Sequence, residues 1–366
     1  MRMRTVDPPA AHAVSALRTR TLRRRLRPDA QAHRPHLPAS CPLGAVRPPA
    51  VARLVYRGRG PAPPGTSAGV AGRRGAPYTA RMNYRHAFHA GNHADVLKHI
   101  VLLALLDAFK RKDSPFFVLD THAGRGRYLF AANEARKTGE AAAGVLRLMG
   151  QPTLPDVVER YLRAVQADNP VGALVAYPGS PLLVAQALRA QDRLAACELQ
   201  PEEAAELKAL FAHDRRVQVH AGDGYAAIKA FLPPKSGANR IGRGLVLIDP
   251  PYEAQDAEYP LIVAALRETL SRWPQAVCAV WYPIKQRRSL QPFFRKAAAL
   301  PVASALVAEL QVRPDDSPLR LNGSGMLLLN PPWQFEQTLA QALPPLKAHL
   351  GEAGASTRLE WLKREA

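Results

Sequence analysis

The sequence predicts an α/β protein built on a doubly wound, mostly parallel sheet. Short apolar runs typical of buried strands alternate with helix-length segments from residue 94 to residue 329, and this alternation is typical of parallel strands joined by crossover helices. Four strand ends carry acidic or glycine-containing segments, and ligands bind at the carboxyl edge of such sheets. The length of 366 residues allows two average domains, or one large α/β domain with an insertion.

The first predicted elements are a helix over 94–110 and a strand over 116–119, separated by Asp113-Ser114-Pro115. The apolar residues of the helix recur with the period of an amphipathic helix; they are Val96, Leu97, Ile100, Leu103, Ala104 and Leu106. Residues 127–178 are predicted to be mostly helical. Two proline-containing breaks make them too long for a simple crossover, so we expect a small inserted helical subdomain.

Strands and helices continue to alternate beyond this segment. We expect Ser180 to be the N-cap of a helix that starts at Pro181. The sequence closes with two apolar runs that predict an antiparallel hairpin. The predicted helices are 181–190, 201–211 and 259–273, the strands are 194–197, 217–220, 244–248 and 276–281, and the hairpin runs are 305–312 and 325–329.

The positive charge is concentrated in residues 1–81. This segment has 16 arginines and two aspartates but no lysine or glutamate, so it carries +14 of the chain's formal +20, and it holds 12 of the 34 prolines. It cannot bury enough apolar surface to fold, so we expect a disordered Arg/Pro-rich extension. We interpret it as upstream reading frame before a start at Met82. A transit peptide and an RNA-tethering arm are the alternatives.

Cysteine usage and hydropathy favour a cytoplasmic protein with no membrane partner. Cys41, Cys197 and Cys278 show neither paired nor metal-type spacing, which is typical of a reducing compartment. The sequence also contains no apolar run of transmembrane length.

Asp249-Pro250-Pro251-Tyr252 directly follows the strand predicted over 244–248. The Asp249 carboxylate and the Pro250 carbonyl could both accept hydrogen bonds from an exocyclic amino group, and the prolines would hold that carbonyl in place. Tyr252 offers a face on which a flipped base can stack. The pattern therefore predicts methylation of an amino group on a base, with Asp249, Pro250 and Tyr252 as catalytic residues.

The other polar strand ends predict an adenosine-containing cofactor. Asp120-Thr121-His122-Ala123-Gly124-Arg125-Gly126 lets the backbone approach a ligand closely but lacks the spacing of a dinucleotide site. Glu198 could accept from two ribose hydroxyls, and the acid of Gly222-Asp223-Gly224 could accept from an adenine amino group. Together with Asp249, this order of strand ends best fits S-adenosylmethionine.

Five segments resemble the bacterial 23S rRNA adenine-N6 methyltransferase family RlmJ. The most specific is the 17-residue block that runs from Asn83 to His99. The others are Asp120 to Gly124, Tyr177-Pro178-Gly179-Ser180-Pro181, Asp249-Pro250-Pro251-Tyr252 and Trp281-Tyr282-Pro283. The resemblance covers residues 82–366, with local departures at Arg125, Gln200 and the longer loop at 233–243.

The resemblance implies a Rossmann-like class I methyltransferase with a small inserted helical subdomain. It further implies N6-methylation of one adenine of 23S rRNA, adenine 2030. The rRNA, free or in an early ribosomal particle, would be the partner of a monomeric enzyme. Asp249 would bind the target amino group, with Tyr84, His86 and Lys98 near the substrate. The residues that would line the S-adenosylmethionine site are His99, His122, Ser180, Glu198, Asp223 and Gly224.

Other interpretations remain open at this point. A methyltransferase could act on a different nucleic-acid amino group. Four histidines, His86, His89, His93 and His99, invite a metal-dependent hydrolase or nuclease that would use them with Asp95 and Asp249, although they lack a recognisable helical metal spacing. A non-catalytic RNA-binding module is a further alternative. Lys98 and Arg85 are expected to contact phosphate, whereas Asn330-Pro331-Pro332-Trp333 is expected to be structural and to lie outside the cofactor edge.

Overall fold

The computed structural model describes residues 89–130, 139–236, 239–252, 255–318 and 321–364. These residues belong to the second of two compact units, Tyr78–Ala366. The extension predicted over residues 1–81 lies outside the described residues.

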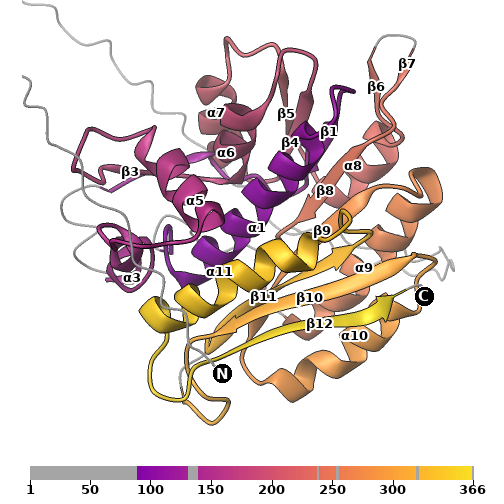
Figure 1. Ribbon diagram of the computed structural model, residues 1–366. Helices are drawn as coiled ribbons and strands as arrows, with labels where there is room; N and C mark the ends of the chain where they lie inside the picture. The colour runs from indigo at the N-terminus through magenta and orange to yellow at the C-terminus, as the bar shows by residue number, and fades with distance from the viewer. Residues whose placement is uncertain (1–88, 131–138, 237–238, 253–254, 319–320, 365–366) are drawn as a thin grey trace, which may run out of the picture. The chain divides into compact units, whose positions relative to one another are not determined.

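An eight-stranded sheet forms the centre of the domain (Figure 1). Its order is β12-β10-β11-β9-β8-β1-β4-β5. β1 pairs in parallel with β4 on one side and with β8 on the other. β4 also pairs in parallel with β5, and β8 with β9. β11 runs antiparallel to both β9 and β10. The strands are β1 (Phe117–Asp120), β4 (Arg193–Glu198), β5 (Val217–Ala221), β8 (Gly244–Ile248), β9 (Val277–Ile284), β10 (Ser304–Gln311), β11 (Gly323–Leu329) and β12 (Ser356–Arg364).

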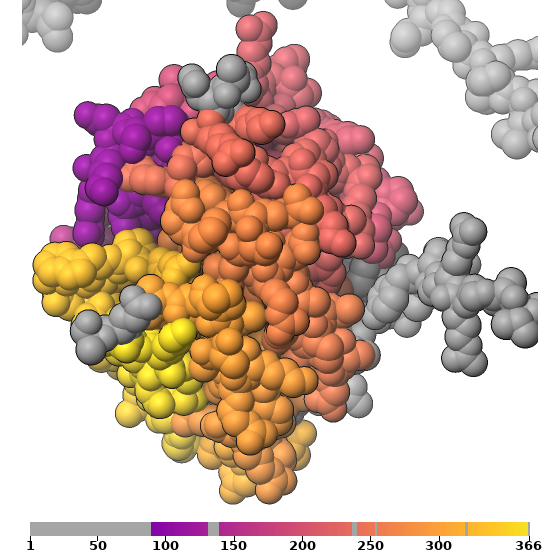
Figure 2. All heavy atoms as spheres, turned by 90° about the vertical axis from the view of Figure 1, so that its right-hand side faces the viewer, coloured from indigo at the N-terminus to yellow at the C-terminus, as the bar shows by residue number. Residues whose placement is uncertain are grey.

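Helices cover both faces of this sheet, as a doubly wound fold requires (Figure 1). Alternate residues of one strand point to opposite faces. On β1, Val118 therefore joins one apolar core, and Phe117 and Leu119 join the other. The first core contains α1 (His93–Lys110), α6 (Ser180–Ala187), α7 (Pro201–Leu210) and α11 (Phe335–Leu350); the second contains α8 (Gly224–Phe231), α9 (Gln255–Arg272) and α10 (Gln291–Ala298). In Figure 2, residues of α9 and α10 occupy the centre of the view.

Helix α1 begins one residue before the predicted start and is more deeply buried than an amphipathic helix. The Asn92 side chain caps it by accepting hydrogen bonds from the backbone N–H groups of Ala94 and Asp95. Every residue from His93 to Leu106 is buried, because α1 packs against α5, α6, α11 and β11. The polar residues of α1 therefore lie inside the protein rather than on its surface.

The segment predicted to be mostly helical also contains two short strands. It comprises β2 (Arg127–Leu129), α3 (Glu140–Ala143), α4 (Val145–Leu148), α5 (Asp156–Gln166) and β3 (Ala176–Pro178), and β2 pairs antiparallel with β3. Val158 and Tyr161 of α5 belong to the same apolar core as α1. That this segment is a distinct subdomain stays a prediction.

The predicted antiparallel hairpin is confirmed, since Ala305 of β10 pairs with Leu329 of β11 and Gln311 with Gly323. The sequence pattern missed β12, which pairs with β10 at the edge of the sheet. It also missed the two-stranded ladder of β6 (Lys235–Ser236) and β7 (Asn239–Arg240) and the 3-10 helix η2 (Arg287–Leu290). Within the described part of the chain, no helix is both long and apolar enough to cross a membrane.

Candidate active site

Four carboxylates lie at or just beyond the carboxyl ends of neighbouring parallel strands. Asp120 ends β1, Glu198 ends β4, Asp223 follows β5 and Asp249 follows β8. These strands are adjacent in the sheet, so their ends meet along one edge, where α/β proteins bind ligands. The sequence predicted three of the four as site residues; it did not assign a site role to Asp120.

Asp249 is held by a buried lysine on α1. The Lys98 ammonium donates to Asp249 Oδ2 at 2.6 Å and contacts Asp95 Oδ1 at 2.8 Å. Asp95 Oδ2 also accepts the Gly91 backbone N–H at 3.0 Å. Burial lowers the pKa of Lys98, but the two carboxylates outweigh it and raise that pKa well above its ordinary value. Lys98 is therefore charged, and it fixes the position of one Asp249 oxygen.

This arrangement corrects the phosphate contact that we expected for Lys98. The lysine is only 4% exposed, and its ammonium lies between two carboxylates, so it cannot reach an RNA backbone in this conformation. The placement near Asp249 nevertheless agrees with a position beside the substrate. Tyr84, His86 and Arg85 lie outside the described residues.

Tyr252 is tied to the neighbouring strand β9. Its hydroxyl donates to the Trp281 carbonyl at 2.5 Å, and the two rings meet edge to face with centroids 5.4 Å apart. The Trp281 ring also lies 6.0 Å from the Lys98 ammonium. Trp281 thus contacts both Tyr252 and the lysine that holds Asp249. Sequence reasoning gave it no site role, although its place just beyond Val280, the partner of Ile248, was a usable signal.

Asp120 is fully buried at the end of β1. Its Oδ2 accepts the Ser180 hydroxyl at 2.7 Å, and its Oδ1 accepts the His122 backbone N–H at 3.3 Å. Burial raises the pKa of Asp120 to about 7, against the opposing effect of the Ser180 hydrogen bond. Such a carboxyl changes its charge near neutral pH.

Ser180 is not the N-cap that the sequence predicted. Gly179 occupies the cap position, and Ser180 is the first residue of α6, with its hydroxyl directed to Asp120 instead of to the helix backbone. The Asp120 carboxyl, which ends the neighbouring strand β1, lies 2.7 Å from this hydroxyl and accepts it in place of the helix backbone.

His122 lies in the loop after β1 with its ring against Tyr225 of α8. The two ring centroids are 5.1 Å apart in an edge-on arrangement. Thr121 Oγ1 lies 2.8 Å from His122 Nδ1 and donates to the Leu247 carbonyl at 2.9 Å. Burial lowers the pKa of His122 to about 4, so the imidazole is neutral at physiological pH.

Glu198 connects the ends of β1 and β4. Its Oε2 accepts the Gly124 backbone N–H at 2.9 Å, and its Oε1 accepts the Gln200 backbone N–H at 2.7 Å. Gly124 has a φ of +60°, which favours glycine. Burial raises the pKa of Glu198. The Glu198 carboxylate has further lone pairs that could accept a hydroxyl.

Asp223 and Gly224 form the start of α8. The Asp223 side chain caps this helix by accepting the Tyr225 backbone N–H at 2.8 Å. A Cβ on Gly224 would lie only 1.9 Å from the Thr121 carbonyl oxygen. The α8 backbone therefore approaches the end of β1 as closely as only glycine permits.

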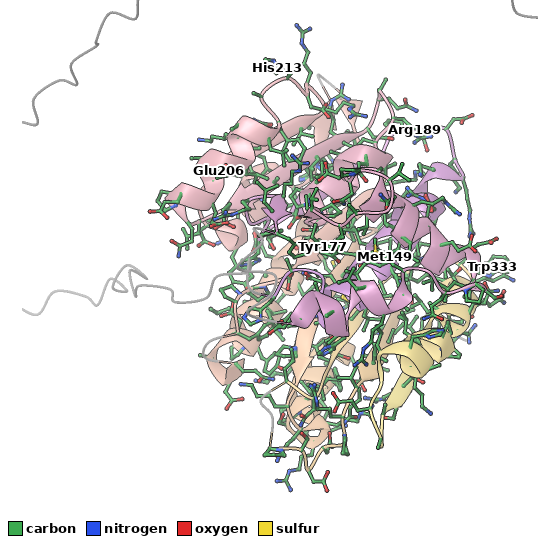
Figure 3. The ribbon with its side chains drawn as sticks, turned by 90° about the vertical axis from the view of Figure 1, so that its left-hand side faces the viewer. Met149, Tyr177, Arg189, Glu206, His213 and Trp333 are labelled. Carbon is green, nitrogen blue, oxygen red and sulfur yellow. The ribbon has the colours of Figure 1, made fainter. Side chains whose placement is uncertain are left out.

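His99 lies deeper than the other residues predicted to line the cofactor. It is 1% exposed, its Nδ1 lies 2.9 Å from the Tyr177 hydroxyl, and the two rings stack with centroids 5.5 Å apart. Tyr177, near the centre of Figure 3, lies 2.9 Å from the Tyr161 hydroxyl. The predicted contact between His99 and a cofactor stays a prediction.

The remaining sequence motifs do not join this site. Asn330 donates through its backbone to the carbonyl of Ser304, at the start of β10, and through its side chain to Pro274 and Ala276, just before β9. The Asn330-Pro331-Pro332-Trp333 loop thus lies at the opposite edge of the sheet, as expected, with Trp333 at the periphery of Figure 3.

Two described histidines of this group contact different partners. His89 bonds to Glu140, whereas His99 contacts Tyr177. In the part of the chain that the structure describes, three or more His, Cys, Asp or Glu side chains do not gather in an arrangement that could hold a metal ion. The metal-dependent alternative therefore has no support from the described residues.

Comparison with known proteins identifies the family. A family model described as "Ribosomal RNA large subunit methyltransferase D, RlmJ" matches residues 113–363. The chain is 43% identical to the Haemophilus influenzae protein named Ribosomal RNA large subunit methyltransferase J over 286 residues, and 40% identical to the Escherichia coli protein of the same name over 285 residues. Each alignment covers 78% of this chain and all of the relative.

A solved structure agrees with these sequence matches. The crystal structure of a Legionella pneumophila protein is similar with a TM-score of 0.67 and 33% identity, covering 74% of this chain and 98% of that protein. The chain belongs to the RlmJ family of ribosomal RNA large subunit methyltransferases.

Proposed function

We propose that this protein transfers a methyl group from S-adenosylmethionine to N6 of an adenine in large-subunit rRNA. The observation that carries the proposal is the arrangement of Asp249. Lys98 holds its Oδ2 at 2.6 Å, and within the described residues its Oδ1 accepts no hydrogen bond. An exocyclic N–H could donate a hydrogen bond to this oxygen.

The carboxyl edge of the sheet fits S-adenosylmethionine. Glu198 at the end of β4 has lone pairs for the two ribose hydroxyls, and Asp223 after β5 has an oxygen for the adenine amino group of the cofactor. The close approach of Gly224 to Thr121 and the left-handed Gly124 bring two backbone segments together there, which supports a ligand lying against the main chain. Asp120 and Ser180 would face the amino acid part of the cofactor.

S-adenosylmethionine, when bound, would supply an electrophilic methyl group on a sulfonium. The residues of this chain would act on the acceptor. Asp249 Oδ1 and the Pro250 carbonyl would accept the two N6 hydrogens, so that the nitrogen lone pair points at the methyl group. Held in this way, N6 would form a bond to the methyl carbon as the carbon–sulfur bond breaks with its electron pair kept on sulfur, and N6 would afterwards release a proton to water. Positioning would therefore supply most of the rate enhancement.

Tyr252 and Lys98 would keep this acceptor site rigid. The Tyr252 hydroxyl is engaged by the Trp281 carbonyl, so the ring is fixed before a base arrives. A flipped adenine can stack on such a ring. Lys98 would keep Asp249 in one orientation and would not contact the RNA itself.

The substrate is assigned through the family. The relatives from Haemophilus influenzae and Escherichia coli are named as large-subunit rRNA methyltransferases, and the resemblance points to adenine 2030 of 23S rRNA. The alternative acceptors are other base amino groups, because the Asp249 and Pro250 acceptors would also fit the exocyclic nitrogen of cytosine or guanine.

The test combines the purified full chain, S-adenosylmethionine labelled in its methyl group and 23S rRNA that lacks modifications. Label in N6-methyladenine, found after digestion to nucleosides, is the expected result. The Asp249→Ala variant should bind the cofactor normally and methylate at least about 100-fold more slowly, as when one transition-state hydrogen-bonding group is removed. Label in another nucleoside, or an Asp249→Ala variant of full activity, would contradict the proposal.

A further inference from the structure

A small cavity lies at the amino edge of the sheet, which is the edge opposite Asp249. It has a volume of about 290 Å³, close to the lower limit of small-molecule sites. It lies where β1, β4 and β5 begin, and β6 adds one further side chain. Four of the described side chains that line it are cations, and none of them is a carboxylate. The lining comprises Phe117, Arg193, Leu194, Arg215, Arg216, Gln218 and Lys235.

Two of the four cations are held in fixed positions. The Arg193 guanidinium donates through Nη1 to two backbone carbonyls of the loop before β4, both at 2.7 Å. Arg216 donates through Nη1 to the Leu188 carbonyl of the same loop at 2.6 Å, and its Nε and Nη2 donate to Asp214 at 2.9 and 2.6 Å. These guanidinium groups are therefore ordered before a ligand arrives, and such ordering lowers the cost of binding.

Most of the positive charge around the cavity is not balanced. Asp214 compensates the charge of Arg216. Within the described ranges, Arg193, Arg215 and Lys235 have no carboxylate at ion-pair distance, and Arg215 and Lys235 are exposed. Three uncompensated cations thus face one cavity, and their mutual repulsion is unfavourable unless an anion joins them.

The ladder of β6 and β7 is a second, independent indication of an anion. Lys235 of β6 is paired directly opposite Arg240 of β7, and both side chains are exposed. Like charges directly opposite each other destabilise a strand pair, and in the part of the chain that the structure describes neither side chain pairs with a carboxylate. The ladder belongs to the longer loop at 233–243, where the sequence departs from the family resemblance. A bound anion would offset the repulsion between the two cations.

The chemistry of the lining selects a phosphate. Guanidinium and ammonium groups donate hydrogen bonds and accept none, so their partner must offer several acceptor oxygens and negative charge. The arginine fork matches the geometry of phosphate oxygens. In the proposed function the substrate is large-subunit rRNA, and contacts of arginine and lysine with backbone phosphates supply much of the affinity of proteins for nucleic acids.

The geometry points to a second RNA contact: we infer that this cavity binds a backbone phosphate of the rRNA, remote from the target adenine. Arg193, Arg215 and Lys235 would donate to the phosphate oxygens. The inference rests on the proposed function, because it takes large-subunit rRNA as the substrate. β4 crosses the sheet from this edge to the other in six residues, so at about 3.3 Å per residue the two RNA contacts would be about 20 Å apart. Only an RNA that extends well beyond the target adenine could reach both.

The test measures binding of the full chain to intact 23S rRNA and to a short hairpin that contains the target adenine. In the double variant Arg215→Gln/Lys235→Gln, Kd for intact rRNA should rise about tenfold, the order of effect for lost hydrogen bonds between charged groups. The slope of log K against log salt concentration should become shallower by about 1, as for one lost phosphate contact. The hairpin cannot span the two edges, so its Kd should rise less than about twofold. Methylation of intact rRNA should show the same effect in KM.

Two further double variants serve as matched controls. Arg295→Gln/Lys296→Gln also removes one arginine and one lysine charge, from exposed residues of α10, and should change Kd for intact rRNA less than about twofold. Figure 1 shows α10 at the opposite end of the domain from β6 and β7. Arg215→Lys/Lys235→Arg keeps both charges and should retain the salt dependence of the unmodified protein. Residues 1–81 are present in every variant, so their charge does not enter the comparison.

The outcomes separate this inference from the proposed function. If Arg215→Gln/Lys235→Gln binds intact rRNA with an unchanged Kd and salt slope, or loses no more affinity than the α10 control, the phosphate site is wrong and the methyltransferase assignment stands. An equal loss on the short hairpin would also overturn the inference, because the contact would then lie near the target adenine. Absence of adenine methylation by the unmodified protein on intact rRNA would instead refute the proposed function.

Discussion

Replacing Lys98 by methionine should destabilise the protein strongly. The substitution removes the ammonium that lies 2.6 Å from Asp249 and 2.8 Å from Asp95. The side chain of Lys98 is 5% exposed, that of Asp249 is 16% exposed and that of Asp95 is 3% exposed. Methionine fills a similar volume, so the main effect is that two carboxylates lose their shared counterion. Breaking a buried pair by removing one partner costs about 3–5 kcal/mol, and we expect the free energy of unfolding to fall by that amount.

The same helix offers a matched control. Lys110 also pairs with an aspartate three residues earlier, Asp107, at 2.6 Å, but these side chains are 28% and 40% exposed. Lys110→Met should therefore change the free energy of unfolding by less than about 1 kcal/mol. Denaturant-induced unfolding of the three proteins measures both differences.

A double variant tests whether the unpaired charge of Asp249 causes part of the stability loss of Lys98→Met. Adding Asp249→Asn to Lys98→Met removes one unpaired charge and should restore at least about 1 kcal/mol of the lost stability, because contacting residues are coupled by this order of energy. If Lys98→Met unfolds within about 0.5 kcal/mol of the unmodified protein, the buried triad does not stabilise the fold as argued. If the double variant restores nothing, the pairing with Asp249 is not the energetic link.

Three further perturbations test other parts of the site. Gly224→Ala places a Cβ 1.9 Å from a backbone oxygen, so the free energy of unfolding measured with denaturant should fall by about 3 kcal/mol or more. As a control, the Cβ of Gly222→Ala meets no atom within 4 Å and should change the free energy of unfolding by less than about 0.5 kcal/mol. The pKa of Asp120 is raised from 3.8 to about 7 in the folded protein. Between these two pH values the folded state holds a proton on Asp120 that the unfolded state has lost, so the free energy of unfolding falls as the pH rises from 3.8 to about 7. Asp120→Asn should remove up to about 4 kcal/mol of this pH dependence of the free energy of unfolding, and an unchanged profile would refute the assignment. Tyr252→Phe removes a hydrogen bond to Trp281 but keeps the ring, so stability should fall by about 1 kcal/mol and kcat by less than about tenfold; a larger loss of kcat with normal stability would mean that the hydroxyl acts on the substrate.

The sequence predicted the strands of the parallel sheet because each is a short apolar run ended by polar or turn-forming residues. It missed β12 because the pattern of Ser356–Arg364 is that of an edge strand, and most of its residues are only half-buried. It missed β2 and β3, which pair across about 50 intervening residues. Local propensity does not report such a pairing.

The residues of the candidate site could also be predicted from the sequence only in part. Asp249, Glu198 and Asp223 were predicted because each follows its own strand, and strand ends can be read locally. The partners of Lys98 could not be read in this way, since a lysine in an apolar helix gives no sign of which carboxylate it will meet. The role of Ser180 was misread for a related reason: a serine before a helix favours capping, but here its hydroxyl donates to Asp120 at the end of another strand, which the local sequence does not reveal.

The ion pair between Lys98 and Asp249 also sets an order of events during protein synthesis. The two residues are 151 positions apart, so at about 5–20 residues per second the ribosome adds Asp249 roughly 8–30 s after Lys98. Throughout that interval α1, which is buried on nearly every side in the finished domain, has no complete sheet to pack against. The nascent chain therefore exposes α1, whose residues from His93 to Leu106 are all buried in the finished domain, early in synthesis, and this makes α1 an early binding site for a chaperone.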